Sequence, residues 1–138
     1  MAAIELDDVE KSFGDVLALR GVDLEVQDGE IFGFLGPNGA GKSTTINAIL
    51  DFVRPDSGSI RVLGHDAREN SVPIRERTGV LPEGFDVYDR LSAREHLLFA
   101  IESKGVDDAP ASILERVGLT DATDRKAGGF STGMRQRL

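Results

Sequence analysis

The chain contains no cysteine among its 138 residues. Disulfide bonds and thiolate chemistry therefore contribute neither to its stability nor to a reaction. No apolar run approaches the ~20 residues that a membrane-spanning helix needs. The N-terminus, MAAIELDD, lacks the basic start and the apolar stretch of a secretory signal. These absences favour a cytosolic protein, and any association with a membrane would depend on a partner.

Positive charge is also scarce. The sequence has 16 Lys and Arg against 24 Asp and Glu, which gives a net charge of −8. Proteins that bind duplex nucleic acid usually carry a basic stripe, so this balance predicts no nucleic-acid partner. Only four of the cations are lysines. An acidic, lysine-poor composition fits a high-salt cytoplasm and an ordinary acidic protein about equally well.

One motif with a direct chemical meaning is present. Residues 36–44 read GPNGAGKST and match G-x-x-x-x-G-K-[ST], the phosphate-binding P-loop. Glycines let backbone N–H groups turn toward anionic oxygens, the lysine brings a charge to the β- and γ-phosphates, and the following hydroxyl suits Mg²⁺. The motif predicts a nucleotide site built from Gly36, Pro37, Asn38, Gly39, Ala40, Gly41, Lys42, Ser43 and Thr44.

The residues around the motif agree with it. Residues 30–35, EIFGFL, predict a buried strand that enters the loop. Residues 42–53 predict a helix with one apolar face, and its positive N-terminal end would point at the phosphates. That face contains Ile46, Ile49, Leu50 and Val53. The alternative is a glycine-rich turn that binds nothing, and the agreement of strand, loop and helix disfavours it.

The other elements predict an α/β domain with an antiparallel β flank and a helical subdomain. Strands are expected at residues 4–9, 16–19, 22–26, 59–63 and 78–81, with turns at Gly14–Asp15 and Gly21. Ser92 and Glu95 predict a capping box for a helix that ends near Ser103, before Gly105. A second helix is expected at residues 108–117, with Gly118 as its C-cap, and a last one from Ser131 or Thr132.

A second motif follows at the end of the sequence. Residues 130–138, FSTGMRQRL, resemble the signature of ATP-binding cassette (ABC) ATPases, commonly L-S-G-G-Q followed by R-Q-R. Ser131 and Gly133 match the signature, whereas Phe130, Thr132 and Met134 replace Leu, Gly and Gln. The S-x-G-M-R-Q-R form resembles subunits of ABC-2-type exporters. The resemblance covers the whole chain.

This resemblance implies a P-loop NTPase core of the ABC type at residues 1–86 and a helical subdomain at residues 87–138. It implies an ATPase subunit that binds ATP and Mg²⁺, lies on the inner face of the membrane and drives a separate permease. Ser131 and Gly133 would contact ATP held by a second subunit in a head-to-tail dimer. The alternatives are an ABC-type ATPase of translation or DNA maintenance and a nucleotide-binding module without turnover.

Two more site residues come from the resemblance. Phe13 stands where the family usually has an aromatic residue that stacks on adenine; the other interpretation is a core Phe beside Leu17. Glu83 follows Gly79-Val80-Leu81-Pro82, where the wider family has a Gln that reaches Mg²⁺ and the attacking water. A carboxylate can ligate Mg²⁺ but also repels the γ-phosphate.

The loop at residues 83–90, EGFDVYDR, combines apolar and charged residues. Phe85, Val87 and Tyr88 either contact the membrane subunit or pack under the helical block. His65 and His96 are interpreted as ordinary packing or solvated residues. The pairs Asp7-Asp8 and Asp107-Asp108 are interpreted as turn and cap residues rather than metal ligands.

The family's Walker B strand, with its Mg²⁺-linked Asp and the catalytic Glu, follows the signature and is not among these residues. We therefore expect an N-terminal part of an ABC ATPase that by itself binds ATP without turning it over. The strand at residues 30–35 would lack its usual neighbour, and its uncovered edge would favour aggregation.

Overall fold

The computed structural model describes all 138 residues. They divide into two compact units, Met1–Gly79 and Val80–Leu138, and each has its own hydrophobic core. The division falls after Gly79, a few residues before the boundary at 86/87 that the sequence predicts.

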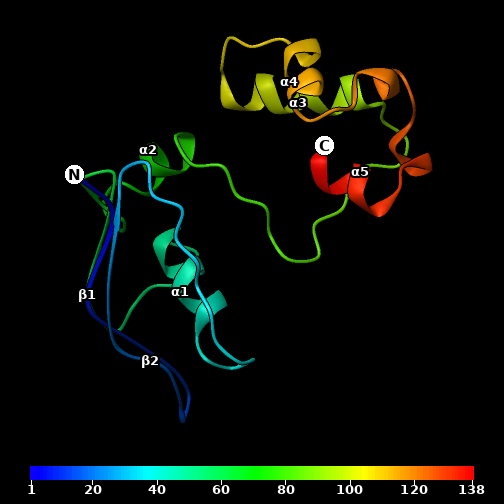
Figure 1. Cartoon of the computed structure of the whole chain (residues 1–138). Coiled ribbons are helices and arrows are strands. Elements are labelled where there is room, and N and C mark those ends of the chain that lie inside the picture. Colours follow the sequence, from blue (N-terminus) through cyan, green and yellow to red (C-terminus); the bar gives the residue numbers. More distant parts are fainter. The chain divides into compact units, whose positions relative to one another are not determined.

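Unit 1 is built on an antiparallel sheet with the strand order β2-β1-β3-β4. The strands β1 (Ala2–Phe13) and β2 (Val16–Gln27) form a long hairpin that turns at Gly14, as predicted (Figure 1). The central strand β1 also pairs with β3 (Ser57–Val62), and β3 pairs with the short β4 (His65–Asp66). The strands predicted at residues 4–9, 16–19, 22–26 and 59–63 therefore exist, and most are longer than expected.

The predicted turn at Gly21 is wrong, because this residue lies inside β2. The pairing of β1 with β2 is irregular between Leu6 and Val9, where Asp8 has φ 46°. Gly21 has φ 64°, and a Cβ there would lie 2.7 Å from Oδ1 of Asp8. The glycine accommodates a bulge, which keeps one long twisted strand in place of two short ones.

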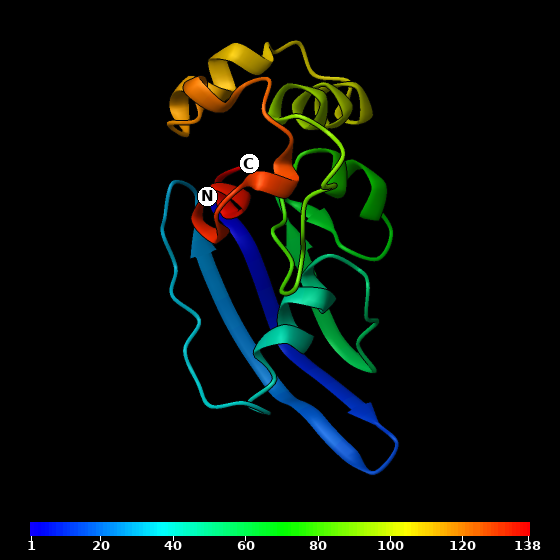
Figure 2. The same ribbon diagram turned by 90° about the vertical axis from the view of Figure 1, so that its right-hand side faces the viewer.

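The helix α1 (Lys42–Ile49) follows the P-loop and packs against β2 and β3 (Figure 2). It ends four residues before the predicted end at residue 53, because Phe52 and Val53 both donate their N–H groups to the carbonyl of Asn47. Its buried residues are Thr45 and Ala48, and Ile46 is 48% exposed, so the predicted apolar face is wrong at that position. The short helix α2 (Ser71–Glu76) adds Ile74 to the core of unit 1.

The strands predicted at residues 30–35 and 78–81 are not formed. None of the strand pairings includes these residues, and every residue from 31 to 40 is exposed. A strand needs a neighbour for its backbone N–H and C=O groups. The apolar composition of residues 30–35 favours a strand, but a strand forms only where a neighbouring strand pairs with it.

Unit 2 is helical, as predicted. The helix α3 (Ala93–Lys104) begins at the Ser92 capping box and ends at Gly105, which has φ 60°. The helix α4 (Pro110–Arg116) starts with a proline in its first turn, and Gly118 follows its C-cap residue Val117 with φ 67°. The 3₁₀ turns η1 (Thr120–Ala122) and η2 (Ala127–Gly129) lead to α5 (Thr132–Arg137).

The core of unit 2 gathers buried side chains from α3, α4 and the segments around them, and Met134 of α5 packs against it. Its buried members are Val87, Ala93, Leu97, Leu114, Leu119, Ala122, Ala127 and Phe130. In neither unit is any helix long and apolar enough to cross a bilayer.

Candidate functional site

The P-loop residues form a turn that leads directly into α1. Ala40 donates its N–H to the carbonyl of Pro37 at 3.1 Å, which closes the turn. Gly41 is the N-cap residue of α1, and its carbonyl accepts from both the N–H and the Oγ1 of Thr45, at 2.8 and 2.9 Å. The buried Thr45 therefore fixes the loop to the first turn of the helix.

Gly41 also brings the loop close to the sheet. A Cβ at this position would lie 2.7 Å from the carbonyl oxygen of Ala18 and 2.9 Å from Cδ2 of Leu19, both on β2. Gly41 has φ 89°, in the left-handed region that side chains disfavour. The glycine predicted for phosphate binding is thus also the point where the loop meets the strand.

Lys42 lies across the same loop. Its Nζ donates to the carbonyl oxygens of Gly36 and Pro37 at 2.5 and 2.7 Å. An ammonium has three donors, so one donor and the full charge remain for an anion. The first N–H groups of α1 have no partners within the helix and add to this local positive field.

The residues around the P-loop could hold Mg²⁺ only together with bound phosphates. The structure contains no group of three or more His, Cys, Asp or Glu that could hold a metal ion. Ser43, at the start of α1, offers one exposed hydroxyl. Mg²⁺ usually takes one or two protein ligands and completes its shell with substrate phosphates and water. A single hydroxyl beside a phosphate loop fits that pattern.

Phe13 lies at the end of the β1–β2 hairpin and is 50% exposed, outside both cores. Leu17, its proposed packing neighbour, is itself 42% exposed. Nζ of Lys11 is 5.4 Å from the centre of the Phe13 ring and also bonds to Asp56 at 2.9 Å. The bonds from Lys11 and from the N–H of Ser12 lower the pKa of Asp56. In Figures 1 and 2 this end of the hairpin and the P-loop lie toward the same end of unit 1.

The remaining predicted site residues belong to unit 2. Glu83 is exposed in a turn where Phe85 donates its N–H to the carbonyl of Pro82 at 3.3 Å. Ser131 caps α5, and its Oγ accepts from the N–H of Met134 at 3.3 Å. Gly133 has open space around its Cα, so the start of α5 presents a bare backbone.

The loop at residues 83–90 combines the two interpretations that its sequence allows. Val87 is buried in the core of unit 2, whereas Phe85 and Tyr88 are 58% and 65% exposed. Packing therefore accounts for Val87. The two aromatic side chains remain on the surface.

Sequence reasoning missed two residues that organise this region. The sequence suggests an ordinary packing or solvated residue at His96, but its Nε2 accepts the backbone N–H of Tyr88 at 2.8 Å. Its Nδ1 lies 2.9 Å from the carbonyl of Ser92, so Nδ1 carries the proton. Arg135 holds four acceptors from two segments. Arg135 is the first residue of the R-Q-R that follows the signature pattern, but that pattern does not indicate its partners on the loop at residues 86–89.

Known proteins resemble this chain over its whole length. Residues 19–138 match the family model of the ABC transporter. The Nod factor export ATP-binding protein I of Rhizobium sp. (strain N33) is 39% identical over 99% of this chain and 46% of its own length. The bacitracin transport ATP-binding protein BcrA of Bacillus licheniformis is 39% identical over 98% of this chain and 45% of its own.

A solved structure described as the ATP binding subunit of an ABC transporter superposes with a TM-score of 0.84 at 28% identity. The match covers 98% of this chain and 58% of that structure. The chain thus spans about half the length of the curated relatives that it matches.

Proposed function

Because the chain belongs to the ABC transporter family, we propose that it acts within an ATP-binding subunit that drives transport by a separate membrane permease. The observation that carries this proposal is the geometry of residues 36–44. Their loop lies close to β2 at Gly41 and is hydrogen-bonded to α1 through Thr45, and the ammonium of Lys42 lies across it. A positively charged loop at a helix start suits a nucleoside triphosphate.

The roles of the loop residues follow from their chemistry. Backbone N–H groups of residues 36–44 and the charge of Lys42 bind the β- and γ-phosphates. Ser43 would hold Mg²⁺ through one ligand, and the chemistry supplied there would be neutralisation of charge on the phosphate oxygens. Phe13 would offer a ring face to adenine. For Glu83, the role that the family pattern implies is contact with the metal or the attacking water.

A second subunit would complete the site. In the proposed head-to-tail dimer, Ser131 and Gly133 contact the γ-phosphate of ATP on the other subunit's loop. The exposed position of Ser131 and the open space at Gly133 support this role. Ser131→Ala should therefore leave ATP binding to a single subunit intact and weaken nucleotide-driven dimerisation.

The permease is the second partner. Phe85 and Tyr88 are exposed aromatic side chains on a charged loop, a combination that suits a protein contact. Through this contact the subunit would lie on the inner face of the membrane. Hydrolysis needs an oriented water and a held metal. Residues 1–138 by themselves are expected to bind ATP without turning it over.

Titration calorimetry with Mg-ATP tests the proposal. Lys42→Ala removes the charge over the loop and should weaken ATP binding at least tenfold, since charge-assisted bonds to phosphate are among the strong ones. Lys126→Ala is the matched control, because Lys126 makes only an exposed ion pair with Glu95 at 3.3 Å. Equal affinities of wild type, Lys42→Ala and Lys126→Ala would refute the proposed nucleotide site.

A further inference from the structure

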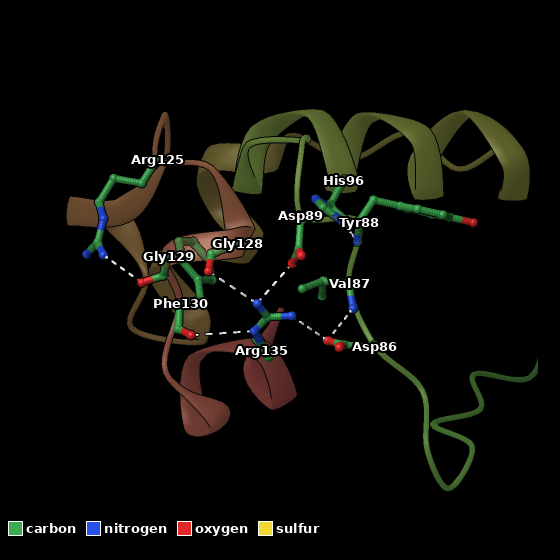
Figure 3. Close-up of polar contacts among 10 residues, drawn as sticks. All are labelled: Asp86, Val87, Tyr88, Asp89, His96, Arg125, Gly128, Gly129, Phe130 and Arg135. Atoms are coloured by element: carbon green, nitrogen blue, oxygen red, sulfur yellow. Dashed lines mark hydrogen bonds and ion pairs between the residues drawn. The ribbon is translucent and has the colours of Figure 1, made fainter.

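Arg135, on α5, connects two segments that are far apart in the sequence. Its Nη1 donates to Asp86 at 2.7 Å and its Nη2 to Asp89 at 2.9 Å. The same guanidinium donates to the carbonyl oxygens of Gly128 and Phe130 at 3.3 and 3.4 Å. Figure 3 shows the group between the two carboxylates on one side and the two carbonyl groups on the other.

The backbone of Arg135 extends this connection to the signature serine. Its N–H donates to the carbonyl of Ser131 at 2.9 Å, and Oγ of Ser131 accepts from Met134. The side chain of Arg135 thus holds the loop at residues 86–89, while its main chain holds the cap of α5. Any displacement of the two carboxylates acts on the residue that supports Ser131.

The loop is itself tied to α3 and to the core. Tyr88 donates its N–H to His96, Val87 is buried, and Asp86 accepts from the N–H of Val87 at 2.8 Å. In this arrangement the Tyr88 ring is exposed and stacks on the His96 ring, with ring centres 5.9 Å apart. The carboxylate of Asp86 is meanwhile held toward Arg135 (Figure 3).

The turn that precedes Ser131 is paired with the same loop through the backbone. Gly128 donates its N–H to the carbonyl of Asp89 at 3.1 Å, and Ala127 donates to Leu91 at 2.9 Å. The side chain of Arg135 therefore adds to a contact that backbone hydrogen bonds already make between these two segments.

The chemistry of the contact requires a guanidinium. Arginine presents five donors in a planar fork, whereas lysine offers one compact charge on a flexible stem. Two carboxylates and two carbonyls in different directions suit the fork. The hydrogen bonds from Arg135 and from the N–H of Val87 lower the pKa of Asp86, and those to Asp86 and Asp89 raise the pKa of Arg135.

We propose that Arg135 is a positioning residue that transmits displacement of the loop at residues 86–89, which carries Tyr88, to the signature turn at residues 128–131. The inference rests on the proposed function, in which Tyr88 meets the permease and Ser131 meets nucleotide. It adds the residue that joins the two contacts within one subunit.

Hydrogen–deuterium exchange on the full-length protein tests this coupling without any need for transport. Asp86→Asn combined with Asp89→Asn perturbs only the loop end of the contact. Exchange of the amides at residues 133–137 should then rise on the order of tenfold, because α5 loses its charge-assisted support. The amides of Ala100 and Ile101 in the second half of α3, away from His96, should stay within about twofold of wild type, which separates a local effect from general destabilisation.

Two further variants complete the experiment. Arg135→Lys keeps the charge but not the fork, and it should raise exchange at residues 133–137 as the carboxylate variants do. Adding the carboxylate changes to Arg135→Lys should then give little further increase. Arg125→Gln is the matched control, because Arg125 holds Gly129 and the Phe130 ring but neither carboxylate. In that background the carboxylate changes should act as in wild type.

Unchanged exchange at residues 133–137 in the carboxylate variant would overturn the proposal, as would equal acceleration in α3. Fully additive effects of Arg135→Lys and the carboxylate changes would also overturn it. ATP binding is measured on the same samples. If Lys42→Ala binds ATP as tightly as wild type, the proposed function is refuted. If ATP binding depends on Lys42 but exchange at residues 133–137 is unchanged in the carboxylate variant, only the coupling is refuted.

Discussion

At the residue scale, Gly41 shows how one position serves both fold and site. Gly41→Ala places a Cβ 2.7 Å from the carbonyl oxygen of Ala18, in a backbone conformation with φ 89°. We expect a loss of about 1–3 kcal/mol in the free energy of unfolding and a marked loss of ATP affinity, measured by chemical denaturation and calorimetry.

Gly39→Ala is the control for that substitution. Gly39 has a similar φ of 85°, but a Cβ there would meet nothing within 4 Å. It therefore reports backbone strain without the collision. Equal losses in the two variants would show that the approach of the loop to β2 has no importance.

The contact between Asp86 and Arg135 predicts a pH dependence. The pKa of Asp86 is lowered in the folded protein, so the unfolded chain binds a proton first as the pH falls. The stabilising contribution is present above the ordinary pKa, near pH 4, and is lost as the pH falls through the lowered value. In denaturant titrations, wild type should exceed Asp86→Asn in stability at pH 6. The difference should shrink below about pH 4. A difference that grows on acidification would contradict the assignment.

Residues whose role is local were predictable, and those that act across the sequence were not. The P-loop motif predicts the roles of Lys42 and Gly41 because the chemistry it describes lies within nine consecutive residues. Arg135 and Asp86 are 49 positions apart, and no periodicity links them. His96 was missed for a related reason, because its partner is a backbone N–H in a loop.

At the element scale, the stability of α3 depends on the capping box at its N-terminus. Ser92 accepts from the N–H of Glu95 at 3.2 Å, and its own N–H donates to the Glu95 carboxylate at 2.6 Å. Removing the Ser92 hydroxyl leaves the first turn of α3 without this bond. Ser92→Ala should therefore cost about 1 kcal/mol in the free energy of unfolding.

Thermal or chemical unfolding checks that cost. Ser112→Ala, at an exposed position in α4, is the matched control and should change stability by less than about 0.5 kcal/mol. If both variants lost the same stability, the capping box would have no special role.

The contrast between α3 and residues 30–35 explains which elements the sequence reveals. Ser92, Glu95 and Gly105 determine both ends of α3 through bonds to their own neighbours in the chain. The segment at residues 30–35 is just as apolar as a buried strand, but its backbone partners would come from elsewhere. Helix ends are local features, whereas strand formation depends on long-range pairing.

At the scale of the whole molecule, the unpaired apolar segment has the largest consequence for solubility. Ile31 is 100% exposed and Leu35 93%, in a segment without regular secondary structure. Apolar residues with free backbone groups promote pairing between copies. In the 138-residue chain, Ile31→Lys should reduce self-association in sedimentation or light scattering without loss of stability.

Val72→Lys controls for the added charge. Val72 is 58% exposed, but it lies in the helix α2, where no strand edge is available. It should leave self-association nearly unchanged. Equal reductions in the two variants would assign the effect to net charge.

The same segment also determines where proteases cleave this protein. Residues 31–40 are all exposed, and they include Phe32, Phe34 and Leu35. No lysine or arginine occurs between Arg20 and Lys42. Exposed connecting segments are where nicking concentrates. Chymotrypsin, which cuts after large apolar residues, should therefore separate the hairpin from α1 in a brief digestion, whereas trypsin should leave this connection whole.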